Sequence, residues 1–278
     1  MRRWLFILGL SQLLCACDTQ NDHSGPSATP LYYTYSEVER QSSDRQFTPK
    51  SPIWIGRPSY SWERRFAGKF PHITKDFFRC RGSEVNPIRT VQTGGQHATC
   101  YRDCGGGEKH SLPLREGKEF VYPVLIELLN YLQDKTDSQV VITSGHRCPL
   151  HNTYIDASES NRASKHQVGA AVTFYVQGFE HQPQTIISFI QEYYQAHQDW
   201  KDQPAFTHFK TYQNTTDVST PPLMNKEILV KVYQAEEGRN LDNRHPYPYL
   251  QLQVRWDRDT KQPVSYTWHG AHRNYHRW

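Results

Sequence analysis

The middle of the chain alternates between helical and strand spacing of its apolar residues. Residues 116–136 carry apolar side chains at helical intervals, whereas residues 138–145 form a short β-branched run that ends in glycine, which is typical of a buried strand. Residues 169–178 repeat the strand pattern, residues 182–200 return to helical spacing, and residues 205–212 alternate as a strand. The order helix, strand, loop, strand, helix, strand predicts a compact α+β core with helices flanking a mixed sheet.

Three further alternating segments follow this core, at residues 227–238, 249–260 and 264–270. Turn residues separate them, so we expect a β-meander that extends the sheet. The folded part therefore divides into a core at residues 110–215 and a C-terminal β extension at residues 216–278.

The first residues predict export from the cell. "MRRWLFILGLSQLLCAC" has two arginines before an apolar run that is too short to span a bilayer, which is the pattern of a secretory signal. Its end, "LLCAC", resembles a bacterial lipobox, which implies cleavage after residues 1–16 and lipidation of Cys17. An ordinary signal peptide is the alternative. The polar residues 17–31 are typical of a flexible tether, so we expect a domain in the periplasm, held by lipid at a membrane of the cell envelope.

The charge of the chain gives no sign of a nucleic-acid partner. The net charge of +4 falls to +2 once the two arginines of the signal, which contains no acidic residue, are removed. A value this small, without a basic block, excludes an extended polyanion as the expected ligand. The aromatic share of 13% suits a surface that stacks on sugars or peptides, and it equally suits a core.

Cysteines mark residues 32–109, which we expect to be irregular and stapled by disulfides. The expected folded part has four cysteines: Cys80, Cys100, Cys104 and Cys148. Thiols of an exported protein oxidise, so two disulfides are the default expectation. We favour Cys80–Cys100 and Cys104–Cys148, although three pairings are possible. A zinc knot made from "CYRDC" with Cys80 and His110 is the alternative, which an oxidising compartment disfavours.

Three motifs of the core occur in one order: "ITSGHRCPLHN", then "SKHQVGAAVTF", then "FTHF". Together they resemble the peptidase M15 family of zinc carboxypeptidases and endopeptidases, which cut the stem peptides of peptidoglycan. The family pattern is S-G-Y/F-R, H-N, S-x-H-x-x-G-x-A-x-D and a strand with a final His. The resemblance covers about residues 110–212, and it implies a fold of the D-alanyl-D-alanine peptidase type. The residues that match are Ser144, Gly145, Arg147, His151, Asn152, Ser164, His166, Gly169, Ala171 and His208.

The resemblance implies a zinc cofactor and assigns roles to single residues. A hydrolytic zinc needs three protein ligands and one open position for water. His166 and His208 fall at two of the ligand positions, and Thr173 falls at the third. Arg147 falls at the position that binds an oxyanion or a substrate carboxylate. Ser164 and His146 stand beside these positions in the sequence and are expected to contact substrate.

Two residues depart from the family pattern. Thr173 replaces the aspartate ligand, and a neutral hydroxyl is a poor zinc ligand. Ala205 occupies the position of the general base, so the proton of a zinc-bound water would have no acceptor there. The sequence thus predicts a domain directed at peptidoglycan peptides, or at a protein partner, with weak or no hydrolysis and a zinc site that is degenerate or empty. The alternative is an active zinc-dependent D,D- or L,D-peptidase with another third ligand.

Overall fold

The protein was studied as a computed structural model that describes residues 66–67, 69–92, 98–158, 161, 163–214 and 216–278. The predicted signal at residues 1–16, the lipidated Cys17 and the tether at residues 17–31 lie outside the described residues. The described residues fall within one compact unit, Arg57–Trp278. Within them, no helix has both the length and the apolar character needed to cross a membrane.

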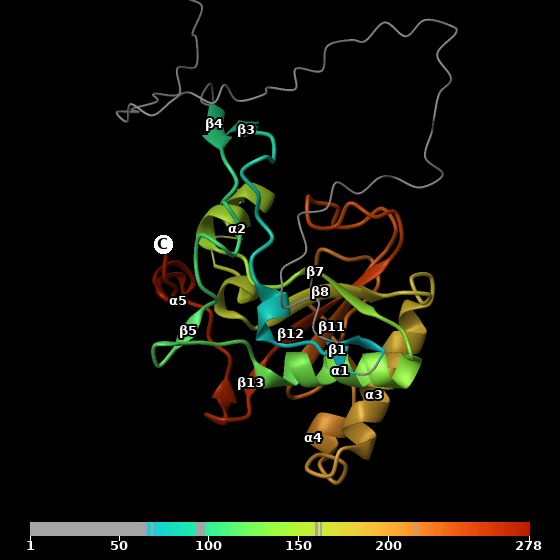
Figure 1. Ribbon diagram of the computed structural model, residues 1–278. Coiled ribbons are helices and arrows are strands. Elements are labelled where there is room, and N and C mark those ends of the chain that lie inside the picture. Colours follow the sequence, from blue (N-terminus) through green and yellow to red (C-terminus); the bar gives the residue numbers. More distant parts are fainter. Residues whose placement is uncertain (1–65, 68, 93–97, 159–160, 162, 215) are drawn as a thin grey trace, which may run out of the picture. The chain divides into compact units, whose positions relative to one another are not determined.

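A six-stranded sheet forms the centre of this unit (Figure 1). Its strands, in spatial order, are β7 (Val140–Ser144), β8 (Ala171–Val176), β12 (Tyr249–Val254), β11 (Ile228–Tyr233), β10 (Leu223–Met224) and β9 (Lys210–Thr211). All five neighbouring pairs are antiparallel. The predicted α+β class is confirmed, whereas the expected mixture of strand directions is not found in the sheet.

Two long helices cover one face of the sheet (Figure 1). They are α1 (Pro123–Thr136) and α3 (Pro183–Ala196), which pack on each other while α1 also contacts β7, β8 and β12. Each begins with a proline in its first turn, where the missing N–H costs no hydrogen bond. Every second residue of the inner strands points toward these helices and joins the apolar core, as Val172, Phe174 and Leu252 do.

The opposite face of the same strands is polar. On β8 it carries Thr173, on β12 it carries Gln251 and Gln253, and on β11 it carries Lys231 and Tyr233; all five line one cleft. Antiparallel pairing sets Gln251 of β12 directly opposite Thr173 of β8. The alternation along three strands therefore separates an apolar core from the floor of a polar cleft.

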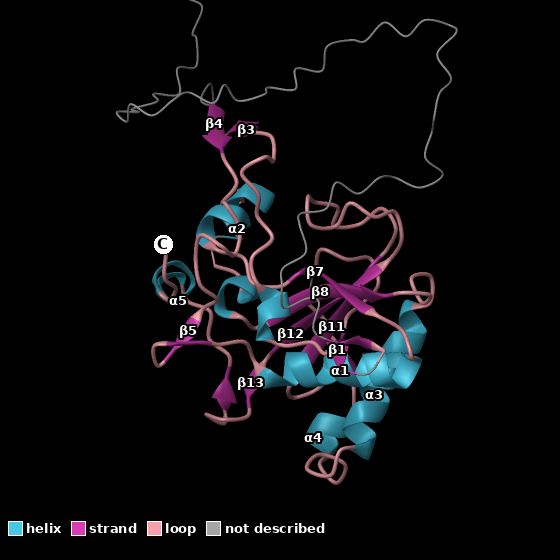
Figure 2. Cartoon of the chain, viewed as in Figure 1, coloured by secondary structure: helices cyan, strands magenta, loops and turns pink. Residues whose placement is uncertain are grey.

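The remaining elements are short (Figure 2). In chain order they are β1 (Phe66–Ala67), β2 (Phe70–Pro71), the 3-10 helix η2 (Lys75–Phe78), β3 (Arg89–Gln92), β4 (Ala98–Tyr101), β5 (Leu114–Arg115), β6 (Lys118–Glu119), α2 (Pro149–Ile155), the 3-10 helix η4 (Lys165–Val168), α4 (Pro204–Thr207), β13 (Trp256–Asp257), β14 (Gln262–Pro263) and α5 (Trp268–Arg273). The hairpin of β3 and β4 projects from the sheet beside α2 (Figure 1).

Two predicted strands differ from the structure. Residues 204–207 form the helical turn α4, which begins at Pro204 and buries Phe206 in the core, so only Lys210–Thr211 pairs as β9. Residues 264–270 run into α5 in place of a third meander strand. The C-terminal strands also do not simply extend the sheet at its edge, because β12 lies between β8 and β11 in the middle of the sheet.

Candidate functional site

The polar face of the sheet forms the floor of a cleft of about 400 Å³. Strands β8, β11 and β12 provide the floor, η4 and the end of α2 provide one wall, and the loop after β11 provides another. Four of the predicted site residues line this cleft: Arg147, Ser164, His166 and Thr173. The structure therefore brings together the centre of the expected peptidase site.

His166 is buried at the base of the cleft, and both of its ring nitrogens have partners. Its Nδ1 donates a hydrogen bond to the carbonyl oxygen of Gly145 at 2.7 Å, and its Nε2 lies 3.0 Å from the amide Nε2 of Gln251. Gln253 fixes the orientation of that amide by donating to the Gln251 oxygen at 2.7 Å. The lone pair that His166 would offer to a metal is therefore taken by the Gln251 amide.

The predicted third member of this set, His208, does not join it. His208 follows α4 near the far edge of the sheet and lines a different pocket, together with Pro204, Ala205 and Trp256. The strand beside Thr173 is β12, and the residue that faces both Thr173 and His166 is Gln251. The predicted ligand set placed His208 on the strand next to β8, but that strand is β12. Ala205, the predicted position of the general base, lies beside His208 and is therefore also outside the cleft.

Arg147 lines the cleft, but its guanidinium is paired with a carboxylate of the protein itself. The Arg147 guanidinium donates from Nε to Ser144 Oγ at 2.7 Å and lies 3.4 Å from the Asp242 carboxylate. Asp242 in turn accepts from His151 Nε2 at 3.0 Å, and Asp103 accepts from His151 Nδ1 at 2.7 Å. Two carboxylates and two cations thus form one buried network beneath the cleft.

The charges of this network fix one another. Burial alone would lower the pKa of His151, but the carboxylates of Asp242 and Asp103 outweigh it and raise the pKa to about 10. Burial would raise the pKa of Asp242, yet the charges of His151 and Arg147 hold it well below its usual value. His151 is therefore a cation and Asp242 an anion near neutral pH, and both serve to orient Arg147.

Ser164 and His146 have roles other than those expected. Ser164 caps η4: its hydroxyl accepts from the backbone N–H of His166 at 3.3 Å, and its own N–H donates to the Gln167 side chain at 2.8 Å. His146 is buried outside the cleft, with its ring packed edge-on against His110 at 5.8 Å between ring centroids. Ser164 therefore positions His166, and His146 lies away from the site in which it was predicted.

The four cysteines are free thiols in the structure, so neither predicted disulfide is formed. Cys80 lies 3.6 Å from Cys104 between sulfur atoms, and Cys148 lies beside them. Cys100 is on β4, where its sulfur contacts the Thr90 hydroxyl of β3. The zinc-knot alternative named Cys80, Cys104 and His110 correctly, but it included Cys100 where the structure has Cys148. The loops that bring these residues together contain no regular periodicity that would have pointed to Cys148.

A catalytic zinc does not fit the donor set of the cleft. Thr173 offers a neutral hydroxyl, Gln251 offers an amide, and the His166 lone pair accepts a hydrogen bond. Within the described residues, groups of three or more metal-binding side chains occur around Cys104 and not on the floor of the cleft. Hydrolytic zinc sites require ligands with free lone pairs and an open position, so the cleft residues lack what the ion needs.

The cleft nevertheless collects positive charge. Its described lining has four cationic side chains and two carboxylates, those of Asp156 and Asp217. Arg147 faces Asp242 and Lys231 pairs with Asp217 at 2.5 Å, so the positive charge left for a ligand is that of Lys165 and Arg239. Burial lowers the pKa of Lys165 to about 8, and its Nζ donates to the Val254 carbonyl at 2.8 Å. Arg239 is clamped by three backbone carbonyls, of which Ala235 is the nearest at 2.6 Å, and its Nη1 is buried without a partner.

Sequence reasoning missed Gln251, Asp242 and Arg239. Gln251 had a visible signal, because "YLQLQV" alternates glutamine with apolar residues and therefore reserves one face for polar contacts. Asp242 and Arg239 lie in the loop between β11 and β12, where the sequence carries no periodicity that points to the cleft.

Comparison with known proteins agrees with the motifs of the core. A family model described as peptidase M15 matches residues 100–210, a span that includes α1, β7, α2, η4, β8 and α3. The strand that carries Gln251 lies outside the matched span. No curated protein and no solved structure matches this chain. The motifs and the family match together identify a peptidase M15 domain within residues 100–210 of this chain.

Proposed function

We propose that this protein is a cell-envelope lipoprotein whose peptidase M15 domain binds peptidoglycan stem peptides in the cleft and hydrolyses them weakly or not at all. The observation that carries the proposal is the hydrogen bond from Gln251 to His166 Nε2 at 3.0 Å, opposite Thr173. Thr173 stands where the family pattern has a carboxylate, and the remaining histidine, His166, is bonded to Gln251 instead of being free for a metal.

Loss of hydrolysis follows from the chemistry of these side chains. A zinc-bound water is activated by the charge of the ion, and the cleft offers no carboxylate from the strand pair to hold that ion. General bases contribute on the order of 100- to 10,000-fold in rate, and Ala205 lies in another pocket and has no basic group. The remaining features, an oriented Arg147 and a preformed cleft, serve binding.

Binding of an acidic peptide follows from the walls of the cleft. The stem peptides of peptidoglycan carry free carboxylates, which guanidinium and ammonium groups bind. Arg239 is in the lining, and its guanidinium carbon lies 5.0 Å from the Tyr249 ring centroid. Tyr233 stacks on Tyr249 at 4.7 Å, so the guanidinium rests on a rigid aromatic wall. Such a fixed donor suits a carboxylate ligand.

The test is to titrate the purified chain with soluble muropeptides in a calorimeter and to analyse the same mixtures by mass spectrometry. We expect measurable binding without cleavage. Arg239→Ala should weaken binding about tenfold, which corresponds to about 1.4 kcal/mol. Lys118→Ala removes one exposed positive charge on β6, outside the cleft, and should bind as the wild type does.

Two results would contradict the proposal. Equal affinity of the Arg239→Ala and Lys118→Ala variants would remove the cleft as the binding site, and a protein ligand would become the better candidate. Zinc-dependent cleavage of muropeptides, lost in His166→Ala, would establish the alternative of an active peptidase with an altered ligand set.

The proposed anchor is tested separately. Cys17→Ser should either release the protein into the soluble fraction or leave its signal uncleaved, because the lipid could no longer be attached. Fractionation of the cell envelope and the mass of the mature N-terminus measure both outcomes. A Cys17→Ser protein that is processed and still bound to the membrane would show that Cys17 is no anchor.

A further inference from the structure

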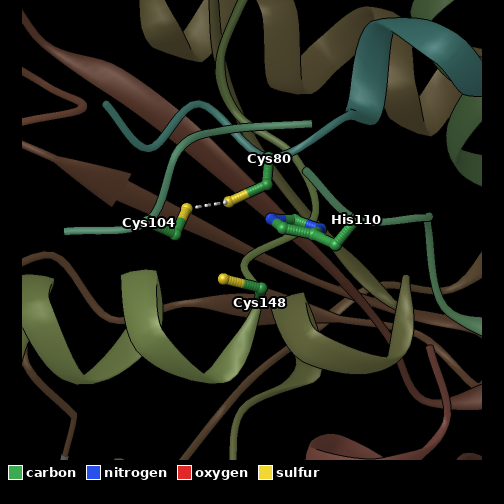
Figure 3. A group of neighbouring side chains, drawn as sticks. All are labelled: Cys80, Cys104, His110 and Cys148. Carbon is green, nitrogen blue, oxygen red and sulfur yellow. Dashed lines mark hydrogen bonds between the residues drawn. The ribbon is translucent and has the colours of Figure 1, made fainter. Parts of the chain in front are cut away.

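Four potential metal ligands meet outside the cleft. They are Cys80 after η2, Cys104 after β4, His110 in the loop before β5, and Cys148 at the N-terminus of α2. Their ligand atoms all lie within 4.8 Å of one another, and all four residues are buried. Figure 3 shows the three sulfur atoms and the His110 ring arranged around one point. We propose that Cys80, Cys104, Cys148 and His110 bind a structural zinc ion, and we call them the Cys3His cluster.

The spacing fits one ion rather than a disulfide. A tetrahedral zinc with bonds of about 2.3 Å to sulfur places neighbouring sulfurs about 3.8 Å apart. Cys80 and Cys104 are 3.6 Å apart between sulfur atoms, whereas a disulfide bond is about 2 Å long. A disulfide also joins only two cysteines, so any disulfide among Cys80, Cys104 and Cys148 would leave the third thiol unpaired. A lone zinc ion uses all three.

His110 is prepared as a ligand. Its Nδ1 donates a hydrogen bond to the carbonyl oxygen of Ser111 at 3.1 Å, so the neutral ring keeps a lone pair on Nε2. That Nε2 is buried and has no hydrogen-bond partner, an arrangement that is costly in the absence of an ion. In Figure 3 a ring nitrogen of His110 is directed toward the sulfur atoms. A carbonyl that holds the far nitrogen of a histidine is a common feature of metal sites.

Two of the sulfur atoms also accept hydrogen bonds of the kind that stabilise a thiolate. Cys104 Sγ accepts the backbone N–H of Gly106, and Cys148 Sγ accepts that of His151, each at 3.4 Å. Backbone N–H groups directed at sulfur stabilise its negative charge. Gly82 completes the enclosure, because a Cβ at this residue would collide with Cys104 Sγ. The cluster therefore requires glycine at residue 82.

Four protein ligands leave no open position, so the ion would stabilise the fold rather than activate water. The cluster joins the segment before β3, the loop after β4 and the start of α2. It also fixes the C-terminal tail, because His110 bridges to Arg277 and the Ser111 N–H donates to the His276 carbonyl at 2.9 Å. Cys148 directly follows Arg147, so the same ion would hold one side of the cleft in place.

The test is the metal content of the full chain, purified from the cell envelope without added metal or chelator. Elemental analysis should find about one zinc per chain. Cys148→Ser should lose it, whereas Cys100→Ser, which removes a thiol of β4 outside the cluster, should retain it. His110→Cys should also retain one metal, because four thiolates form an equally suitable tetrahedral site.

Cobalt gives a readout that does not depend on a stable Cys148→Ser variant. Cobalt-substituted wild type should show absorption bands of tetrahedral cobalt with sulfur-to-metal charge transfer, and His110→Cys should raise the charge-transfer intensity by about one third, in proportion to thiolate number. Identical cobalt spectra of the wild type and His110→Cys would remove His110 from the site.

Three results of the metal analysis would overturn the proposal. The first is a metal-free chain, with free thiols or with a disulfide among Cys80, Cys104 and Cys148. The second is iron or copper in place of zinc. The third is zinc that Cys148→Ser retains and His166→Ala loses, which would place the ion in the cleft. None of these measurements depends on peptide binding. Failure of the zinc proposal would therefore leave the proposed binding of stem peptides untouched, and the reverse also holds.

Discussion

The cleft and the Cys3His cluster both contain side chains of the types that bind metals, but they present them in opposite states. In the cleft, strands hold His166, Thr173 and Gln251 in register, and the histidine already accepts a hydrogen bond from the glutamine. In the cluster, loops bring together three thiols and His110, whose Nε2 has no partner. A metal needs donors that nothing else satisfies, and residue type alone does not reveal which histidine is satisfied.

The largest effect is expected from breaking the cluster. Cys148→Ser should lower the free energy of unfolding by on the order of 5 kcal/mol, because a structural zinc contributes its binding energy to the folded state. Urea unfolding followed by circular dichroism measures this, with Cys100→Ser as the matched control. Equal stability of the two variants would show that the cluster holds no ion that matters for folding.

A smaller effect is expected from rebuilding the cleft site. Thr173→Asp with Gln251→His places a carboxylate and a second imidazole opposite His166, on the strands that the structure pairs. We expect zinc affinity at the cleft to rise about 100-fold, or about 3 kcal/mol. Calorimetric titration of zinc into the chain, with its cluster already filled, measures the gain.

A variant of His208 distinguishes the two possible ligand sets, one that contains His208 and one that contains residue 251. Adding His208→Ala to the double variant should leave its zinc affinity unchanged, because His208 lines another pocket. Should the added change abolish the gained affinity, the ligand set expected from the sequence would be restored and Gln251 would lose its role.

The smallest effect concerns the network that links the two regions. The pKa of His151 is raised from 6.5 to about 10, so its stabilisation is complete below pH 6.5 and is lost as the pH rises through about 10. The depressed pKa of Asp242 acts in the other direction: its stabilisation is present above its usual value of 3.8 and is lost as the pH falls. The network should therefore stabilise most between about pH 4 and pH 6.5.

Between pH 6.5 and pH 8.5 the wild type should lose on the order of 2 kcal/mol of stability that His151→Gln does not lose. Urea unfolding at a series of pH values measures both slopes. His269→Gln, which changes an exposed histidine of α5, should keep the wild-type slope. Parallel curves for His151→Gln and the wild type would mean that His151 is not charged in the folded protein.

Local patterns predicted much of the core. The helical spacing of residues 116–136 gave α1, and the β-branched runs gave β7 and β8, because these periodicities record which side chains are buried. Residues 205–212 show the limit of such patterns. Their alternation suggested a strand, but Pro204 starts a helical turn whose backbone is held by Asn225, which donates to the Phe206 carbonyl at 2.6 Å. That contact comes from a distant segment and leaves no local sign.

The sequence by itself determined the class of the fold and the motifs of the peptidase M15 domain, and it shows a threonine at residue 173, where the family pattern has an aspartate. Only the tertiary structure decided that β12 pairs with β8, so that Gln251 and not His208 faces His166. It also decided that Cys80, Cys104 and Cys148 meet His110. Both outcomes depend on contacts between segments far apart in the chain, and the order of strands in a sheet or the closure of loops follows from packing of the whole core.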